Sequence, residues 1–126
     1  MLSHVAKGDN TMQVIIAGSR SIDIGVDKLS AIVQASGFDI DTVISGGAKG
    51  VDAAGEAYAI AKDLGLKVLK TDWKMGRGAG MINNRRMADQ ADALIAVYDG
   101  ISKGTKNMIE LMKQKGKQVY VYNVQA

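Results

Sequence analysis

The stretch VISGGAKGVDAAGEAYA, residues 43–59, contains the features that decide the fold of this chain. A β-branched apolar run ends at Ser45, two glycines follow directly, and an alanine-rich helical pattern starts close to Gly50. A buried strand followed by a glycine loop and a helix is the repeating unit of parallel α/β sheets. We therefore expect a strand over residues 41–45 and a helix over residues 48–65, with the last residue, Gly65, as its C-cap.

The same alternation of apolar runs and helical patterns continues along the rest of the chain. The expected strands are residues 12–18, 41–45, 66–70, 92–98 and 118–124, and the expected helices are residues 26–36, 48–65, 79–91 and 104–116. Strands that alternate with helices predict a parallel sheet covered on both faces. Right-handed crossovers then predict an α/β fold, a single doubly wound Rossmann-like domain with a five-stranded parallel sheet in the order 3-2-1-4-5.

The composition is that of one globular domain. Of the 126 residues, 47% are apolar and 23% charged, and the net charge is +3. No apolar run is long enough to cross a membrane, and the absence of cysteine fits a cytoplasmic protein. A single histidine predicts no metal site. Residues 1–11 are expected to be a flexible N-terminal tail rather than a signal peptide, ahead of the domain at residues 12–126.

Three polar, glycine-bearing loops are expected to meet at one edge of the sheet. Ligands of doubly wound folds bind outside the carboxyl ends of the strands, where the strand order reverses. The loops GSRS (18–21) and YDGISKGT (98–105) follow strands at that point, and SGGAKGVD (45–52) lies beside them. Glycines let a phosphate approach the backbone, and the next helix presents free N–H groups to it. Lys49 would add a charge, and Arg20 can bind phosphate through two parallel hydrogen bonds.

Each of these loops taken alone is also typical of a tight strand-to-helix turn, whereas the three together predict a phosphate- or nucleotide-binding site. Asp52 suits the positive end of the helix dipole, or could contact a ribose hydroxyl. Trp73 either stacks on a base or covers the end of the sheet, and the second interpretation is favoured. Its segment WKMGRGAGM (73–81) is glycine-rich and basic, as a flap over a ligand would be. The methionines at 81, 87, 108 and 112 are expected to pack into the core.

Taken in order, these motifs resemble the SLOG superfamily of Rossmann-like domains, which includes the lonely-guy phosphoribohydrolases and the DNA-processing protein DprA. The closer similarity is to its small bacterial and phage YspA-like branch. The matching segments are VIIAGSRS (14–21), VISGGAKGVD (43–52), DWKMGRGAGMINNRRM (72–87) and ADALIAVYDGISKGTKNMIELMKQKGKQVYVY (91–122). The resemblance implies binding of a nucleotide or an NAD- or ADP-ribose-derived ligand, no required cofactor, and a homo-oligomer.

The resemblance also implies which residues contact the ligand. They are Gly18, Ser19, Arg20, Gly46, Gly47, Gly50, Asp52, Asn84, Arg85, Gly104 and Thr105. We add Lys49 and Gly100 because they lie in the same loops. The family pattern selects Arg85 over Arg86, which points about 100° away on a helix.

Whether the ligand is cleaved or only bound stays open. The phosphoribohydrolases carry glutamates two and three residues after the threonine of the glycine-rich loop, and here those positions are Asn107 and Met108. Glu110 lies five residues after Thr105, about 140° away around the helix. We therefore do not expect Glu110 in the pocket, and binding without cleavage, for sensing or sequestration, is favoured.

Two carboxylates remain as candidate catalytic residues if the chain is an enzyme. Asp99 and Asp52 could act in an N-glycosidic bond hydrolase or transferase, with Asp99 the better placed. Binding of single-stranded nucleic acid, as in DprA, is a third hypothesis and ranks last. It would need a basic groove with stacking aromatic side chains, whereas only 5% of the residues are aromatic and the net charge is only +3.

Overall fold

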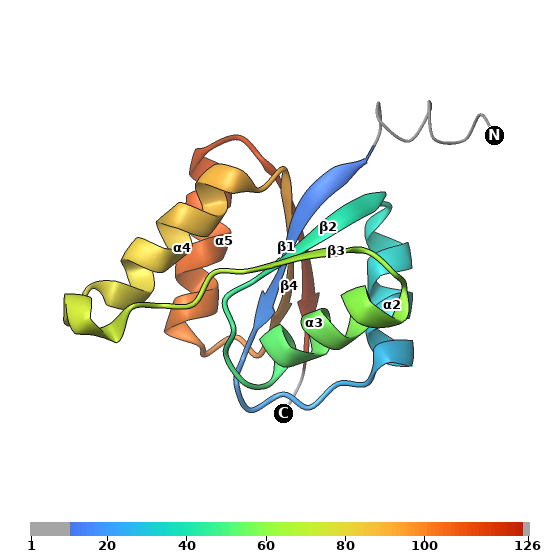
Figure 1. The fold of residues 1–126 in the computed structure, drawn as a ribbon, viewed down its shortest axis with the longest axis horizontal. Coiled ribbons are helices and arrows are strands. Elements are labelled where there is room, and N and C mark those ends of the chain that lie inside the picture. The colour runs from blue at the N-terminus through green and yellow to red at the C-terminus, as the bar shows by residue number, and fades with distance from the viewer. Residues whose placement is uncertain (1–10, 125–126) are drawn as a thin grey trace.

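The computed structural model describes residues 11–124, and it contains a five-stranded sheet with helices on both sides (Figure 1). The strands are β1 (Met12–Gly18), β2 (Ile40–Ser45), β3 (Gly65–Val68), β4 (Ala93–Tyr98) and β5 (Gln118–Asn123). The helices are α2 (Val26–Ser36), α3 (Val51–Ala61), the 3-10 turn η1 (Trp73–Met75), α4 (Ala79–Gln90) and α5 (Lys103–Gln114). All four strand pairs are parallel, in the order β3-β2-β1-β4-β5, so the predicted fold class and strand order are confirmed.

Two hydrophobic cores hold the sheet between its helix layers. Helices α2 and α3 pack on one side of the sheet, and α4 and α5 pack on the other (Figure 1). Successive residues of the central strand β1 alternate between the two cores: Val14 and Ile16 face α2 and α3, and Ile15 faces α4 and α5. All three side chains are fully buried, because β1 has a strand on each side and a helix layer on each face.

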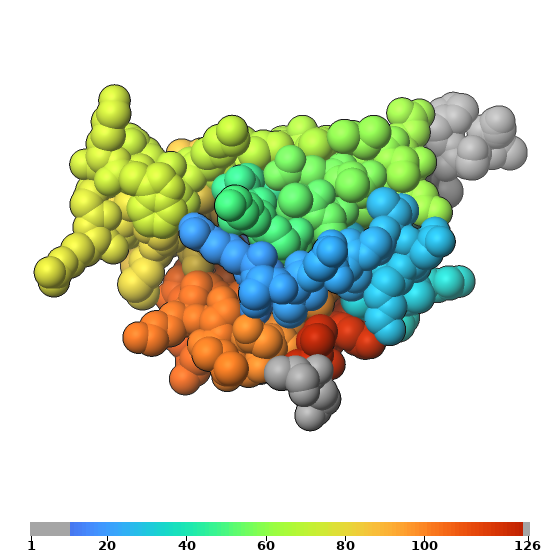
Figure 2. Space-filling view, turned by 90° about the horizontal axis from the view of Figure 1, so that it is seen from below, coloured from blue at the N-terminus to red at the C-terminus, as the bar shows by residue number. Residues whose placement is uncertain are grey.

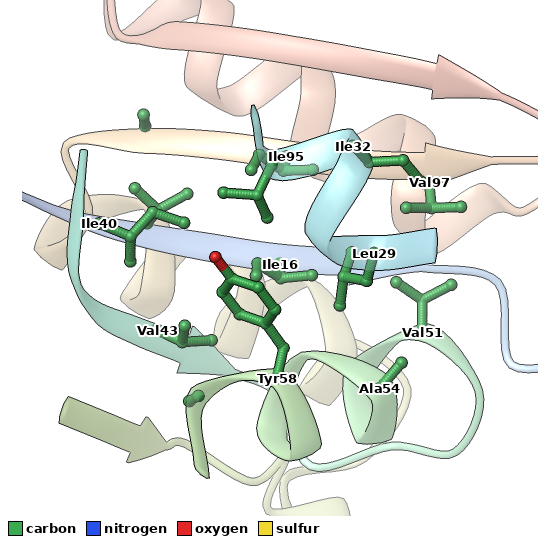
Figure 3. Close-up of a cluster of buried hydrophobic side chains, with 14 residues drawn as sticks. Ile16, Leu29, Ile32, Ile40, Val43, Val51, Ala54, Tyr58, Ile95 and Val97 are labelled. Carbon is green, nitrogen blue, oxygen red and sulfur yellow. The ribbon is translucent and has the colours of Figure 1, made fainter. Parts of the chain in front are cut away.

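Tyr58 anchors the first of these cores. Its ring extends from α3 toward Ile16 and Val43 of the sheet, while Leu29 and Ile32 of α2 lie nearby (Figure 3). Burying side chains of this size stabilises the fold by about 1.5–3 kcal/mol each. The contact fixes α3, and therefore its N-terminal end, against the carboxyl edge of the sheet.

One predicted helix differs from the observed one by more than two residues at each end. The helix expected over residues 48–65 is the shorter α3, and the prediction that Gly65 caps it is wrong. The chain leaves the helix through Lys62 and through Asp63, whose φ is 57°. Gly65 instead starts β3 opposite Thr42, where a Cβ would lie only 2.7 Å from the Thr42 Oγ1 atom. The glycine is therefore explained by close contact between two strands.

The prediction for the methionines is correct for Met87, Met108 and Met112, which are buried. It is wrong for Met81, whose side chain is 54% exposed, because the first turn of α4 borders a cleft instead of the sheet. The expected N-terminal tail lies outside the described residues except for Thr11. Between residues 11 and 124, no helix is long and apolar enough to cross a membrane.

Candidate functional site

A cleft of about 820 Å³ opens at the carboxyl edge of the sheet. Figure 2 views the molecule from this side, where the segments following β1 (blue), β3 (yellow-green) and β4 (orange) surround a depression. Its walls come from the loops after β1 and β2, the segment around η1, the first half of α4 and the first turns of α5. Because β1 and β4 are neighbours whose following loops turn to opposite faces, the cleft lies where the strand order reverses.

Two of the loop glycines serve the packing of the cleft wall. Gly50 has φ of 72°, and a Cβ on it would lie 2.4 Å from the Ser19 carbonyl oxygen and 2.5 Å from that of Arg20. A Cβ on Gly18 would lie 2.2 Å from the Val97 carbonyl oxygen. These glycines bring the start of α3 and strand β4 against β1 and its loop. Gly50 therefore faces another loop, and it lines a smaller neighbouring hollow instead of the cleft.

Asp52 is the buried carboxylate of the site. It lies in the first turn of α3, is 8% exposed, and its Oδ2 accepts a hydrogen bond from the Ala48 amide at 3.2 Å. Burial is the main cause that raises the pKa of Asp52 to about 6; the Ala48 amide and Arg20 oppose the rise, and the negative charge of Glu56 adds to it. Its carboxyl therefore changes charge near neutral pH, as catalytic and binding carboxylates often do.

A second carboxylate, that of Glu56, is hydrogen-bonded to Ser45, the last residue of β2. The Ser45 hydroxyl donates to Glu56 Oε2 at 2.7 Å and accepts a hydrogen bond from the Gly47 amide at 3.1 Å. Ser45 is fully buried, so these two bonds satisfy a hydroxyl that water cannot reach. The arrangement fixes the conformation of the loop after β2.

Asp99 has a structural role at the start of the loop before α5. Its Oδ1 accepts hydrogen bonds from the amides of Ile101 at 2.8 Å and Ser102 at 2.9 Å. The Ser102 and Ile101 amides lower the pKa of Asp99, and the nearby Ser19 hydroxyl contributes without reaching it in hydrogen-bonding geometry. A carboxylate held ionised in this way is poorly suited to donate a proton at neutral pH.

The first turn of α5 forms one wall of the cleft. The Ser102 side chain caps the helix by accepting from the Thr105 amide at 3.3 Å, and its hydroxyl lies 2.9 Å from that of Thr105. Asn84 of α4 holds this turn by donating to the Gly104 carbonyl at 3.0 Å and to Asn107 Oδ1 at 2.9 Å. The amides of the first helical residues have no intrahelical partner and form a positive helix end.

The Ser19 hydroxyl is a buried polar group in the cleft wall that has no hydrogen-bond partner among the described residues. Its residue is only 3% exposed and lines the cleft, yet its hydroxyl makes no hydrogen bond to any part of the chain that the structure describes. Buried hydroxyl groups in folded proteins nearly always have a partner. The cleft is the side from which a ligand atom could supply one.

The structure brings most of the predicted site residues together. Those that line the cleft are Gly18, Ser19, Arg20, Gly46, Asp52, Asn84, Asp99, Gly104 and Thr105. Those that do not line it are Gly47, Lys49, Gly50, Arg85 and Gly100. Lys49 and Arg85 are exposed elsewhere, so their side chains lie outside the cleft in this conformation.

Several lining residues were not predicted. Arg77, Lys103 and Lys106 add positive charge, and the basic, glycine-rich segment around Arg77 was the signal for the first of them. Glu110 also lines the cleft, so the expectation that it stays outside the pocket is wrong. The angle from Thr105 was not a sufficient guide, because Lys106 and Asn107 also line the cleft and Glu110 follows them by one turn on the same helix face. Within residues 11–124, no cluster of three potential metal ligands occurs.

Comparison with models of known protein families, with curated protein sequences and with solved structures finds no match to this chain.

Proposed function

We propose that the chain is a SLOG-like domain that binds a nucleotide, or a ligand derived from NAD or ADP-ribose, in the cleft at the carboxyl edge of its sheet. The observation that carries the proposal is the buried, unpartnered Ser19 hydroxyl in the cleft wall. A ligand phosphate oxygen would accept its hydrogen bond and would lie near the positive end of α5. The cleft volume of about 820 Å³ falls in the range of small-molecule sites.

The charges of the cleft support an anionic ligand. The basic side chains in its lining are Arg20, Arg77, Lys103 and Lys106. The acidic ones are Asp52, Asp99 and Glu110. Of the acids, Asp52 is buried and partly protonated near pH 6, and Asp99 is ionised but already accepts hydrogen bonds from two amides of its own loop. The accessible charge is therefore mainly positive, which favours a phosphate-bearing molecule.

Binding without cleavage is the favoured form of the proposal. Asn107 and Met108, the positions at which the similar phosphoribohydrolases carry glutamates, line the cleft without supplying a carboxylate, and Glu110 is a single acid from α5 where those enzymes carry two. Asp99, the better placed candidate in the sequence, is held by the loop before α5. We further propose a cytoplasmic homo-oligomer, for which exposed Ile60 on α3 and Val68 on the edge strand β3 offer apolar contact area.

A screen of purified protein against AMP, ADP, ATP, NAD, ADP-ribose and cyclic ADP-ribose tests the proposal. A ligand at 100 times its dissociation constant stabilises the fold by about 2.7 kcal/mol, a shift of several degrees in melting temperature. Chromatography of each mixture should recover the ligand intact. Arg20→Ala should weaken binding, whereas Arg86→Ala removes the same charge at an exposed position outside the cleft and should not.

Ser19→Ala gives the sharpest variant. If the hydroxyl serves a ligand, its removal should weaken ligand binding while leaving the melting temperature of the free protein nearly unchanged, because the hydroxyl makes no hydrogen bond there. Ser30→Ala on α2, outside the cleft, is the control. Unchanged binding by Ser19→Ala, or no thermal shift with any compound in the screen, would reject the proposed site.

Asp52 favours a second candidate, hydrolysis or transfer at the N-glycosidic bond of a nucleotide. Its raised pKa lets the carboxyl exchange a proton near pH 6. Release of free base in the same screen would indicate this activity, with a rate that changes around pH 6 and is abolished in Asp52→Asn. Intact recovery of every bound ligand would exclude it for those compounds.

A further inference from the structure

Trp73 lies at the cleft with most of its indole uncovered. It begins η1, a turn held by the Lys74 amide donating to Asp72 Oδ1 at 3.1 Å and by the Gly76 amide donating to the Trp73 carbonyl at 3.2 Å. Its side chain is 63% exposed and lines the cleft. The favoured expectation that Trp73 packs over the end of the sheet therefore does not describe its position, and residues 11–124 leave most of its apolar surface uncovered.

Arg20 faces this ring from the opposite wall. Its guanidinium carbon lies 6.0 Å from the centroid of the Trp73 ring, although Arg20 follows β1 and Trp73 follows β3. A planar group in contact with both would need two van der Waals separations, about 7–8 Å in all. Both side chains are exposed, so a displacement of about 1–2 Å would open that space.

Other apolar side chains surround the same opening. Met81 of α4 is 54% exposed and Ile101 of the loop before α5 is 78% exposed, and both line the cleft. A cleft that combines exposed apolar side chains with a buried hydroxyl and a positive helix end has two chemically different parts. The first suits an apolar planar group, and the second suits an anion.

We propose that Trp73 and Arg20 form a stacking clamp for the base of the bound molecule. This inference rests on the proposed function, because it assigns the base of a bound nucleotide to the apolar part of the cleft. Two consecutive residues would then contact different parts of the ligand. The buried Ser19 would contact the phosphate, and the exposed Arg20 would cover the base. Since every base has a π face, the clamp tolerates different bases, and guanidinium contact with the ring system adds to it.

The fluorescence of Trp73 tests the clamp directly, because the chain contains one tryptophan. AMP and ADP-ribose should quench and shift its emission, whereas ribose 5-phosphate, which lacks the base, should bind without this change. Titration calorimetry then compares variants. Trp73→Ala should weaken AMP binding about 5- to 150-fold and leave ribose 5-phosphate binding unchanged, and Trp73→Phe should retain most of the affinity.

Ile82→Ala, which removes an exposed apolar side chain of α4 that does not line the cleft, should leave both affinities unchanged. Wild-type affinity for AMP in Trp73→Ala, with ribose 5-phosphate still bound, overturns the clamp and leaves the proposed function standing. Loss of self-association in Trp73→Ala, measured by analytical ultracentrifugation and without a change in AMP affinity, overturns it in favour of an interface between copies. Wild-type protein that binds neither compound defeats the proposed function and the clamp together.

Discussion

The Asp52 carboxylate accepts a hydrogen bond from the Ala48 amide at 3.2 Å, four residues earlier in the chain. The contact closes the loop between β2 and α3 onto the first turn of its own helix. A Cβ on Gly46 would lie 2.9 Å from the same carboxylate oxygen, so the glycine leaves room for it. The glycine-rich loop is thus built around a buried acid.

Stability should fall as Asp52 ionises. Its pKa is about 6 in the folded protein and 3.8 in a model peptide, so the folded state binds more protons between these values. The stabilisation is complete below pH 3.8 and is lost as the pH rises through about 6. Urea denaturation from pH 4 to 7.5 should show that Asp52→Asn lacks this loss, which amounts to about 3 kcal/mol.

Asp89→Asn is the matched control for that series. Lys115 lowers the pKa of Asp89, so the contribution of Asp89 is lost as the pH falls, with the opposite sign. A wild-type pH dependence that Asp52→Asn leaves unchanged would contradict the assignment of the raised pKa to Asp52.

Replacing Asp99 should affect stability most at neutral pH. Asp99→Ala removes the acceptor of the Ile101 and Ser102 amides and should lower the melting temperature. Because hydrogen bonds lower the pKa of Asp99, its contribution is present above the ordinary pKa and declines as the pH falls through the lowered one. Asp99→Asn should recover part of the loss, since its amide oxygen can still accept. Equal melting temperatures of wild type and Asp99→Ala at pH 7 would contradict this structural role.

Gly50→Ala and Gly104→Ala should have opposite effects on stability. A Cβ on Gly50 would meet two carbonyl oxygens at a positive φ, which should destabilise the fold by about 2–5 kcal/mol. Nothing lies within 4 Å of a Cβ on Gly104 in the first turn of α5, so alanine there should be neutral or stabilising by up to about 1 kcal/mol. Urea denaturation measures both.

The same Gly104→Ala variant should weaken ligand binding if a phosphate approaches the open side of that backbone. A stable variant with wild-type affinity would show that the ligand lies away from the first turn of α5.

Asn84→Ala should loosen the contact between α4 and α5. It removes hydrogen bonds to the Gly104 carbonyl and to Asn107, for a cost of about 1–2 kcal/mol. Arg85→Ala, at the next position but exposed, should change the free energy of unfolding by less than about 0.5 kcal/mol. If the two variants are equally stable in urea, the Asn84 contacts do not hold the cleft wall.

The topology could be predicted because it follows from periodicity and connection rules. Apolar runs such as residues 12–18 alternate with amphipathic helices, and right-handed crossovers leave few sheet orders to consider. The convergence of the loops after β1, β2 and β4 follows from that order, so residues such as Ser19 and Thr105 could be placed at one edge in advance.

The roles of particular residues could not be predicted, because they depend on which side of a loop each atom faces. The sequence pattern around Gly50 would be the same whether the side of its backbone that lacks a Cβ faced a ligand or, as observed, the Ser19 carbonyl. Asp99 is an acid at the correct edge, yet its position is set by two amides of its own loop. The exposure of Trp73 depends on the direction in which η1 leaves the sheet, and that direction has no periodic signature.

The close packing of Gly50 against the Ser19 and Arg20 backbone limits how the sequence around this cleft could change in evolution. The loops after β1 and β2 are interlocked at van der Waals limits, so a change of length or residue in one requires a matching change in the other. The segment after β3 is less constrained: nothing lies within 4 Å of a Cβ on Gly80, and Gly76 restricts substitution only through its φ of 86°. New ligand preferences should therefore arise by exchanging residues 71–81, while the interlocked half of the cleft is inherited unchanged.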